Sequence, residues 1–223
     1  MIDTLLSFVA PHHCSGCGEL GTLLCHNCKY DIISEPFSAC IACGKGIAGK
    51  QGLGKECSDV PYERAWCVAP RHDVLQRLLD DYKFANTKAA FKPLAGLLHE
   101  HMPELPPNVH IVPVPTVNSH IRQRGYDHTL LLSRRFAKPR GLRVSPVLLR
   151  ATNTMQRGAN KRQRIKQAKV AFVCHETLDA ETIYLLIDDV ITTGATVRFA
   201  AQTLIDAGAQ TVWVASISRQ TLD

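Results

Sequence analysis

One stretch constrains the fold of this chain more than any other: residues 185–197, read as LLIDDVITTGATV. The apolar run 183–187 is typical of a strand that is buried on both faces of a parallel sheet. Asp188 and Asp189 follow at the carboxyl end of this strand, and a small, hydroxyl-rich turn then leads into a helical pattern. Ligands of open α/β sheets lie beyond the carboxyl ends of strands, so this order predicts an α/β domain with its ligand there.

The turn and the acid pair favour different parts of one ligand. A glycine-containing turn that opens a helix presents backbone N–H groups and the positive end of the helix dipole, which suits a phosphate. Adjacent carboxylates accept hydrogen bonds from sugar hydroxyls and help to hold a hydrated Mg²⁺. The sequence therefore predicts a ribose 5-phosphate site. The alternative is an ordinary acidic turn before a threonine-capped helix. The turn residues are Thr192, Thr193, Gly194, Ala195 and Thr196.

The amino-terminal part of the chain is rich in cysteine. Seven of the nine cysteines lie before residue 60. In a reducing compartment, clustered cysteines are better explained as metal ligands than as disulfides. Two Cys-x-x-Cys pairs, separated by seven residues, predict a tetrahedral four-thiolate zinc site. A redox pair, or a nearby histidine in place of one thiolate, is the alternative. The predicted ligands are Cys14, Cys17, Cys25 and Cys28.

A third pair, Cys40 and Cys43, predicts a possible second zinc site together with Cys57. No fourth cysteine stands beside Cys57, and the position where one is expected is Gly54. The second site is therefore incomplete, completed by Cys67 or a histidine, or vestigial. The sequence leaves all three readings open.

Composition shifts along the chain divide it into two predicted units. A glycine-rich loop over residues 44–54 separates a Cys-rich zinc-binding module, residues 1–59, from a main domain, residues 60–223. Prolines in the strand candidate 109–115 predict an edge strand or a strand end. Within the main domain we expect strands at 64–69, 109–115, 144–149, 170–173, 183–187 and 211–217. We expect a helix that Asp73 caps, and further helices over 87–101, around 130–132 and over 196–207.

Positive charge is concentrated in one part of the chain. Twelve of the 26 Lys and Arg residues lie between Asp127 and Glu176, where there is no acidic residue. This block predicts a phosphate-rich partner, either a small pyrophosphate or a nucleic-acid backbone, although a solvated basic face is the alternative. Arg122 and Arg124 precede Gly125 near an expected helix start, which suits an anion unless they lie in a solvated loop.

Two further expectations concern mobility and location. The polar, basic stretch 152–169, which contains Arg162, is expected to be a mobile loop that orders over a phosphate ligand, or a disordered basic segment. No apolar run is long enough to span a membrane, and residues 5–10 lack a basic leader. The sequence alone therefore favours a cytoplasmic protein.

With these pieces placed, the chain resembles the ComF/GntX family of competence-associated proteins, which are similar to type I phosphoribosyltransferases and carry an amino-terminal zinc finger. The loop 188–196 resembles the phosphoribosyl-pyrophosphate (PRPP) loop of those enzymes. The resemblance extends over nearly the whole chain. It rests on the cysteine knuckles, the Tyr82-Lys83-Phe84 element, the Arg122-x-Arg124-Gly125 turn, the loop 188–196, and the basic stretch with Gln156 and Arg162.

The resemblance implies a mostly parallel five-stranded sheet with flanking helices, and Mg²⁺ bound with PRPP or a nucleotide-like molecule. It also implies a role in DNA uptake and natural transformation, with single-stranded DNA and competence or recombination proteins as partners. If there is pentosyl transfer, Asp188, Asp189 and Arg124 are the implied catalytic residues. The implied PRPP-binding residues are Asp188, Asp189, Thr192, Thr193, Gly194, Ala195, Thr196, Lys83, Arg122, Arg124 and Arg162.

The chain departs from the family pattern in two places that bear on activity. The family often has Phe-Asn-Gln after the glycine of the arginine turn, where this chain has Tyr126-Asp127-His128. Enzymes that act on 6-oxopurines usually carry an Asp at the position of Thr192, and a threonine is no general base at neutral pH. Ordinary purine salvage is therefore not expected. The alternative function is a non-catalytic DNA-binding or partner-docking protein that retains the fold.

Overall fold

The computed structural model describes residues 11–46, 52–85, 87–150 and 172–220. Its main sheet has five strands in the order β1-β7-β6-β2-β3, and every pairing in it is parallel. This confirms the expected α/β fold with a mostly parallel five-stranded sheet. The strands are β1 (Arg64–Pro70), β2 (Val109–Pro113), β3 (Arg143–Val144), β6 (Ile183–Ile191) and β7 (Thr211–Arg219).

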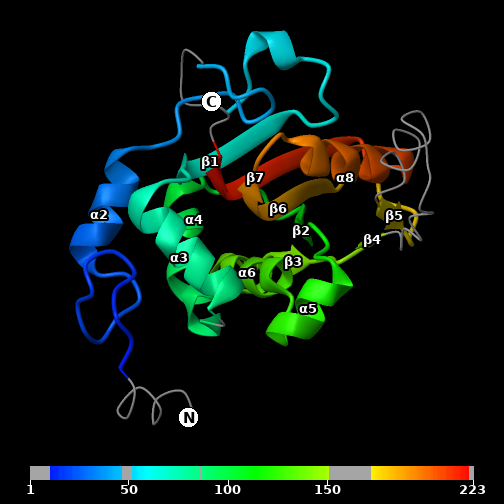
Figure 1. The fold of residues 1–223 in the computed structure, drawn as a ribbon. Coiled ribbons are helices and arrows are strands. Elements are labelled where there is room, and N and C mark those ends of the chain that lie inside the picture. Colours follow the sequence, from blue (N-terminus) through cyan, green and yellow to red (C-terminus); the bar gives the residue numbers. More distant parts are fainter. Residues whose placement is uncertain (1–10, 47–51, 86, 151–171, 221–223) are drawn as a thin grey trace, which may run out of the picture.

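Helices cover both faces of the sheet (Figure 1). One face packs against α3 (Asp73–Phe84), α4 (Phe91–His101) and α6 (His128–Ala137), and the other against α8 (Ala195–Asp206). The amino-terminal helix α2 (His26–Ser34) lies beside α3 and β1. The other helical elements are short: α5 (Asn118–Arg124) and the 3-10 helices η1 (Lys55–Cys57), η2 (Lys88–Ala90) and η3 (Lys138–Arg140).

Strand β6 lies inside the sheet, and its successive side chains point alternately into the two hydrophobic cores. Leu185 and Ile187 belong to the core under α3, α4 and α6, whereas Tyr184 and Leu186 belong to the core under α8. The uninterrupted apolar run is therefore required by burial on both faces. By the same alternation, Asp189 continues the first series and Asp188 the second. The strand is longer than expected and includes both acids.

Prolines explain two features of the neighbouring strands. β2 pairs with β6 on one side and β3 on the other, so it is an interior strand that ends at Pro113. Of the two readings of its prolines, the strand end is right and the edge is wrong. The expected strand 144–149 is interrupted at Pro146, which has no N–H to donate. Beyond it, β4 (Leu148–Arg150) pairs antiparallel with β5 (Phe172–Cys174).

Two local predictions need correction. Asp73 is the first residue of α3 and has φ +46°, while His72 occupies the cap position. Arg122 and Arg124 lie in neither a loop nor a helix start, because they form the last turn of α5, which ends at Gly125 with φ +76°. The carboxyl end of a helix carries the negative end of its dipole, so α5 gives an anion no help there.

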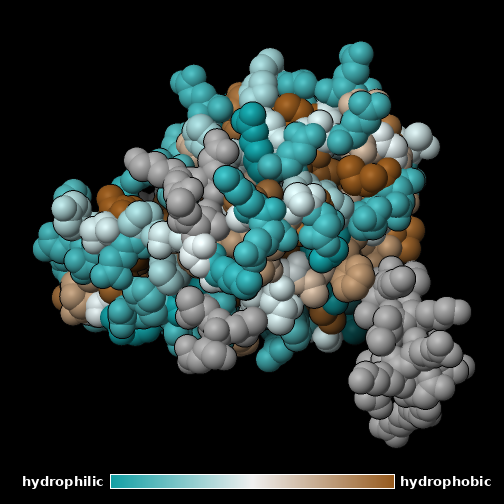
Figure 2. All heavy atoms as spheres, turned by 90° about the horizontal axis from the view of Figure 1, so that it is seen from above, coloured by the Kyte–Doolittle hydropathy of each residue, from teal (hydrophilic) through white to brown (hydrophobic). Residues whose placement is uncertain are grey.

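None of the helices in the described ranges is long and apolar enough to cross a membrane. The face seen in Figure 2 is mostly hydrophilic, and its hydrophobic side chains are scattered in small patches. The boundary near residue 59 between a Cys-rich module and a main domain stays a prediction.

Candidate functional site

Asp189, at the carboxyl end of β6, is the centre of a buried ionic cluster. The residue is 2% exposed, and its Oδ2 lies 2.8 Å from Lys83 Nζ and 3.0 Å from His128 Nε2. Burial by itself raises the pKa of a carboxyl group, but Lys83 and His128 outweigh it and hold the pKa of Asp189 well below its usual range. Lys83 comes from the last turn of α3 and His128 from the first residue of α6, so strand and helices meet here.

His128 is oriented by its second ring nitrogen. Nδ1 lies 3.0 Å from Nη1 of Arg124 and 3.2 Å from Oγ1 of Thr116. A guanidinium only donates hydrogen bonds, so Nδ1 accepts and Nε2 carries the proton that faces Asp189. We call Asp189, Lys83, His128 and Arg124 the Asp189 cluster.

The three residues that depart from the family pattern each have a definite role in the structure. The Asp127 carboxylate caps α6 by accepting the N–H of Leu130 at 3.1 Å. Tyr126 donates its hydroxyl to the carbonyl of Tyr82 at 2.5 Å, and His128 belongs to the Asp189 cluster. The sequence signal for the cap is an Asp directly before an apolar helix. The role of His128 has no local signal, because its partners come from distant segments.

Asp188 is in a different state from Asp189. It is half-buried, and its Oδ1 accepts the backbone N–H of Asp189 at 2.9 Å. Burial and the neighbouring Asp189 charge raise the pKa of Asp188 to about 7, against the opposing influence of Lys83 and His128. The strand alternation places it on the α8 side of the sheet, where the next residues form the turn. The structure therefore separates Asp189, which Lys83 and His128 hold, from Asp188, which forms no ion pair among the described residues.

The turn that opens α8 is covered on one side only. Gly194 adopts φ +78° and is buried, and a Cβ placed on it would lie 3.1 Å from the carbonyl oxygen of Ala42. Thr192, Thr193 and Ala195 are exposed. Within the described chain, no hydrogen bond or ion pair joins either carboxylate to Gly194. The turn keeps an open side with backbone N–H groups at a helix start.

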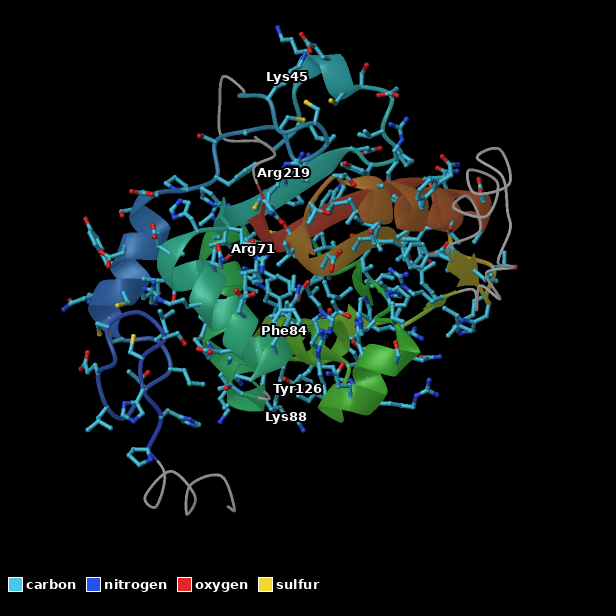
Figure 3. The ribbon with its side chains drawn as sticks, viewed as in Figure 1. Lys45, Arg71, Phe84, Lys88, Tyr126 and Arg219 are labelled. Atoms are coloured by element: carbon cyan, nitrogen blue, oxygen red, sulfur yellow. The ribbon has the colours of Figure 1, made fainter. Side chains whose placement is uncertain are left out.

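Arg219, on the neighbouring strand β7, contacts the same segment that packs against Gly194. It is the last residue of β7, is 1% exposed, and donates through Nη1 to the carbonyl oxygen of Ile41. Figure 3 labels Arg219. A Cβ placed on Gly44 would lie 3.1 Å from Nη2 of Arg219. The segment 40–44 therefore lies between Arg219 and Gly194. No sequence pattern indicated this contact.

The sulfur atoms of the first four cysteines lie close together, as ligands of one metal ion must. The sulfur atoms of Cys14, Cys17, Cys25 and Cys28 all lie within 4.8 Å of one another. The N–H groups of Cys25 and Cys28 point at Sγ of Cys14 and Cys25, at 3.4 Å and 3.5 Å. A Cβ on Gly16 would stand 2.4 Å from Sγ of Cys28, so only glycine fits there. Four clustered thiols can hold a metal ion, and this donor set suits zinc.

The second group has three members. The sulfur atoms of Cys40, Cys43 and Cys57 lie within 4.8 Å of one another, and the N–H of Gly54 points at Sγ of Cys40 at 3.2 Å. Cys67 is buried elsewhere and donates to the carbonyl of Ala69. In the described ranges, no histidine, acid or further cysteine joins the three at that distance.

The remaining predicted ligands are scattered. Arg122 is exposed and takes no part in the Asp189 cluster, whereas Arg124 is half-buried within it. Thr196 is half-buried in the first turn of α8. Arg162 and the stretch 152–169 lie outside the described residues.

Comparison with known proteins gives three curated relatives, and no family model matches the chain. Competence protein ComFC of Bacillus subtilis (strain 168) is 24% identical, over 89% of this chain and 83% of that protein. Competence protein F of Haemophilus influenzae is 27% identical, over 88% of this chain and 90% of that protein. DNA utilization protein YhgH of Salmonella typhi is 27% identical, over 88% of this chain and 96% of that protein.

These relatives confirm the resemblance to ComF-type competence proteins. Among solved structures, the allosteric regulatory enzyme of purine biosynthesis matches with a TM-score of 0.42 and 18% identity, over 56% of this chain and 25% of that one.

Proposed function

We propose that this chain, as a homologue of competence proteins, binds PRPP or a related ribose 5-phosphate at the carboxyl end of β6 and serves the handling of imported single-stranded DNA. One observation carries the proposal. A half-buried carboxylate, Asp188, precedes an exposed, hydroxyl-bearing turn at the start of α8, beside Asp189, whose carboxylate is already paired with Lys83.

Each part of the ligand has a matching group. The backbone N–H groups of residues 193–196 would take the 5-phosphate at the positive end of α8. The carboxylate of Asp188 would accept hydrogen bonds from the ribose hydroxyls and help to hold the Mg²⁺ that accompanies a pyrophosphate. The Mg²⁺ would supply charge neutralisation, and Arg124 would add a fixed positive charge nearby. Asp189 would act as a positioning residue, because Lys83 and His128 already occupy its carboxylate.

The site limits the reactions that can follow binding. Thr192 stands where a purine-specific enzyme usually has an acid, and its hydroxyl does not take a proton from a base at neutral pH. If ribosyl transfer follows binding, the acceptor must therefore need no general base from this position.

Replacing Asp188 by asparagine is expected to weaken binding of PRPP with Mg²⁺ roughly ten- to a hundredfold, because hydrogen bonds to a charged acceptor are lost. Titration calorimetry measures the affinity, and the rise in melting temperature on adding the ligand checks it independently. Asp206→Asn is the matched control, since Asp206 is exposed at the far end of α8. Equal affinities for the wild type and Asp188→Asn would exclude Asp188 from the site.

Ligand affinity is also expected to rise between about pH 6 and about pH 8. Only ionised Asp188 accepts both ribose hydrogen bonds, and its pKa is raised to about 7, so the ionised fraction grows about tenfold over this range. The ligand phosphate titrates near pH 6 as well, so the relevant quantity is the difference in slope between the wild type and Asp188→Asn. Parallel slopes for the two proteins would contradict the assignment.

A further inference from the structure

Phe84 differs from the other apolar residues of α3 in its exposure to solvent. The helix buries Leu75, Leu78, Leu79 and Tyr82 at helical spacing, but Phe84, its last residue, is 71% exposed. Burial of a phenylalanine side chain stabilises a fold, so this fold gains little from an aromatic ring that stays in water. An exposed ring beside a polar site is free to receive a stacked ligand.

The ring of Phe84 is connected to the Asp189 cluster on two sides. Its chain neighbour Lys83 reaches Asp189 at 2.8 Å. The guanidinium carbon of Arg124 lies 5.7 Å from the centre of the Phe84 ring, and Nη1 of the same side chain lies 3.0 Å from Nδ1 of His128. The ring therefore lies against Arg124, a member of the cluster.

A second aromatic residue supports this end of α3. Tyr126 packs on Tyr82 with ring centres 5.7 Å apart, and Lys88 Nζ lies 5.8 Å from the Tyr126 ring centre. Figure 3 labels Phe84, Tyr126 and Lys88 near the carboxyl end of α3. The surroundings of Phe84 are thus cationic and aromatic, which suits an anionic ligand with a flat ring better than an apolar protein surface.

We propose that Phe84 is the stacking platform for the nucleobase of a 5′-nucleotide whose phosphorylated ribose occupies the site at β6. The inference rests on the proposed function. Arg124 lies over the ring, and the 71% exposure of Phe84 leaves it accessible to a base, in the way that aromatic residues receive bases in nucleic-acid-binding proteins. Phe84 is then a residue that distinguishes a nucleotide from a bare sugar phosphate.

The test compares three probes: ribose 5-phosphate, adenosine 5′-monophosphate and a ten-residue oligo-dT. In the wild type, the nucleotide is expected to bind roughly 5- to 150-fold more tightly than ribose 5-phosphate, which is the usual contribution of one stacked base. Phe84→Ala should abolish this ratio and leave the affinity for ribose 5-phosphate unchanged, whereas Phe84→Trp should retain it. Tyr30→Ala is the matched control, because Tyr30 is a 62% exposed aromatic residue on α2.

The possible results distinguish a failure of this inference from a failure of the proposed function on which it rests. A wild type that binds the nucleotide no more tightly than the sugar phosphate overturns the inference alone. So does a Phe84→Ala variant with an unchanged ratio. An effect of Phe84→Ala on oligo-dT without one on the nucleotide overturns the assignment to a mononucleotide. Absence of ribose 5-phosphate binding in the wild type defeats the proposed function, and a Phe84-dependent affinity for the nucleotide would still support the platform.

Discussion

Replacing Lys83 by methionine is expected to lower the free energy of unfolding by about 3–5 kcal/mol, since it leaves a buried carboxylate without its ammonium partner. Asp189 is 2% exposed, and the Lys83 side chain is 17% exposed, so solvent does little to screen the pair. His128 remains beside the carboxylate, but its ring does not replace the ammonium that the substitution removes. Urea denaturation at pH 7, with the slope compared to that of the wild type, measures the loss.

Two further variants show whether burial is the cause. Lys83→Met combined with Asp189→Asn should regain much of the lost stability, because no uncompensated charge is then buried. Lys29→Met removes an ammonium from the more exposed pair with Glu100, and such surface pairs contribute at most about 1 kcal/mol. An equal loss in Lys29→Met and Lys83→Met would refute the special role of the buried pair.

Replacing Cys28 by alanine is expected to remove one zinc ion per chain and to unfold the segment around α2. Its sulfur is buried among those of Cys14, Cys17 and Cys25, and three remaining thiolates bind the metal far more weakly than four. Structural zinc contributes roughly 10 kcal/mol or more to the folding of small zinc modules, so the loss should be visible in the melting temperature. Elemental analysis of the purified protein gives the zinc content directly.

The control for the zinc prediction is Cys174→Ala. Cys174 lies in β5, outside both cysteine groups, and its replacement should change neither the zinc content nor the melting temperature. Zinc content that is the same in the wild type and Cys28→Ala would show that the four thiols hold no ion. Cys57→Ala reports separately on the three-cysteine group.

The sequence sufficed for the architecture because the features that determine it are local. The apolar run before Asp188 required a strand buried on both faces, and the alternating pattern of residues 211–217 lay within the true bounds of β7. The break at Pro146 and the helix α5 escaped prediction, although the missing N–H of the proline is itself a local signal.

The chemistry of the site was less accessible because it depends on partners that are distant in sequence. Two adjacent aspartates look equivalent in a motif, yet the ammonium of Lys83 and the ring of His128 make Asp189 a fixed anion. Burial and the charge of Asp189 instead raise the pKa of Asp188 to about 7. The contact between Arg219 and Ile41 was equally invisible, because neither residue belongs to a recognisable pattern.

The position of β7 has a consequence for how the protein acquires its shape during synthesis. β7 follows every other strand in the chain order, yet it lies between β1 and β6 and also carries Arg219, which holds the segment 40–44. The ribosome therefore releases the cysteines of that segment long before the strand that fixes their surroundings exists. Until β7 has been synthesised, β1 has no partner strand in the sheet, and the segment 40–44 lacks its contact with Arg219. During that time the cysteine thiols of this segment remain accessible to metals and oxidants.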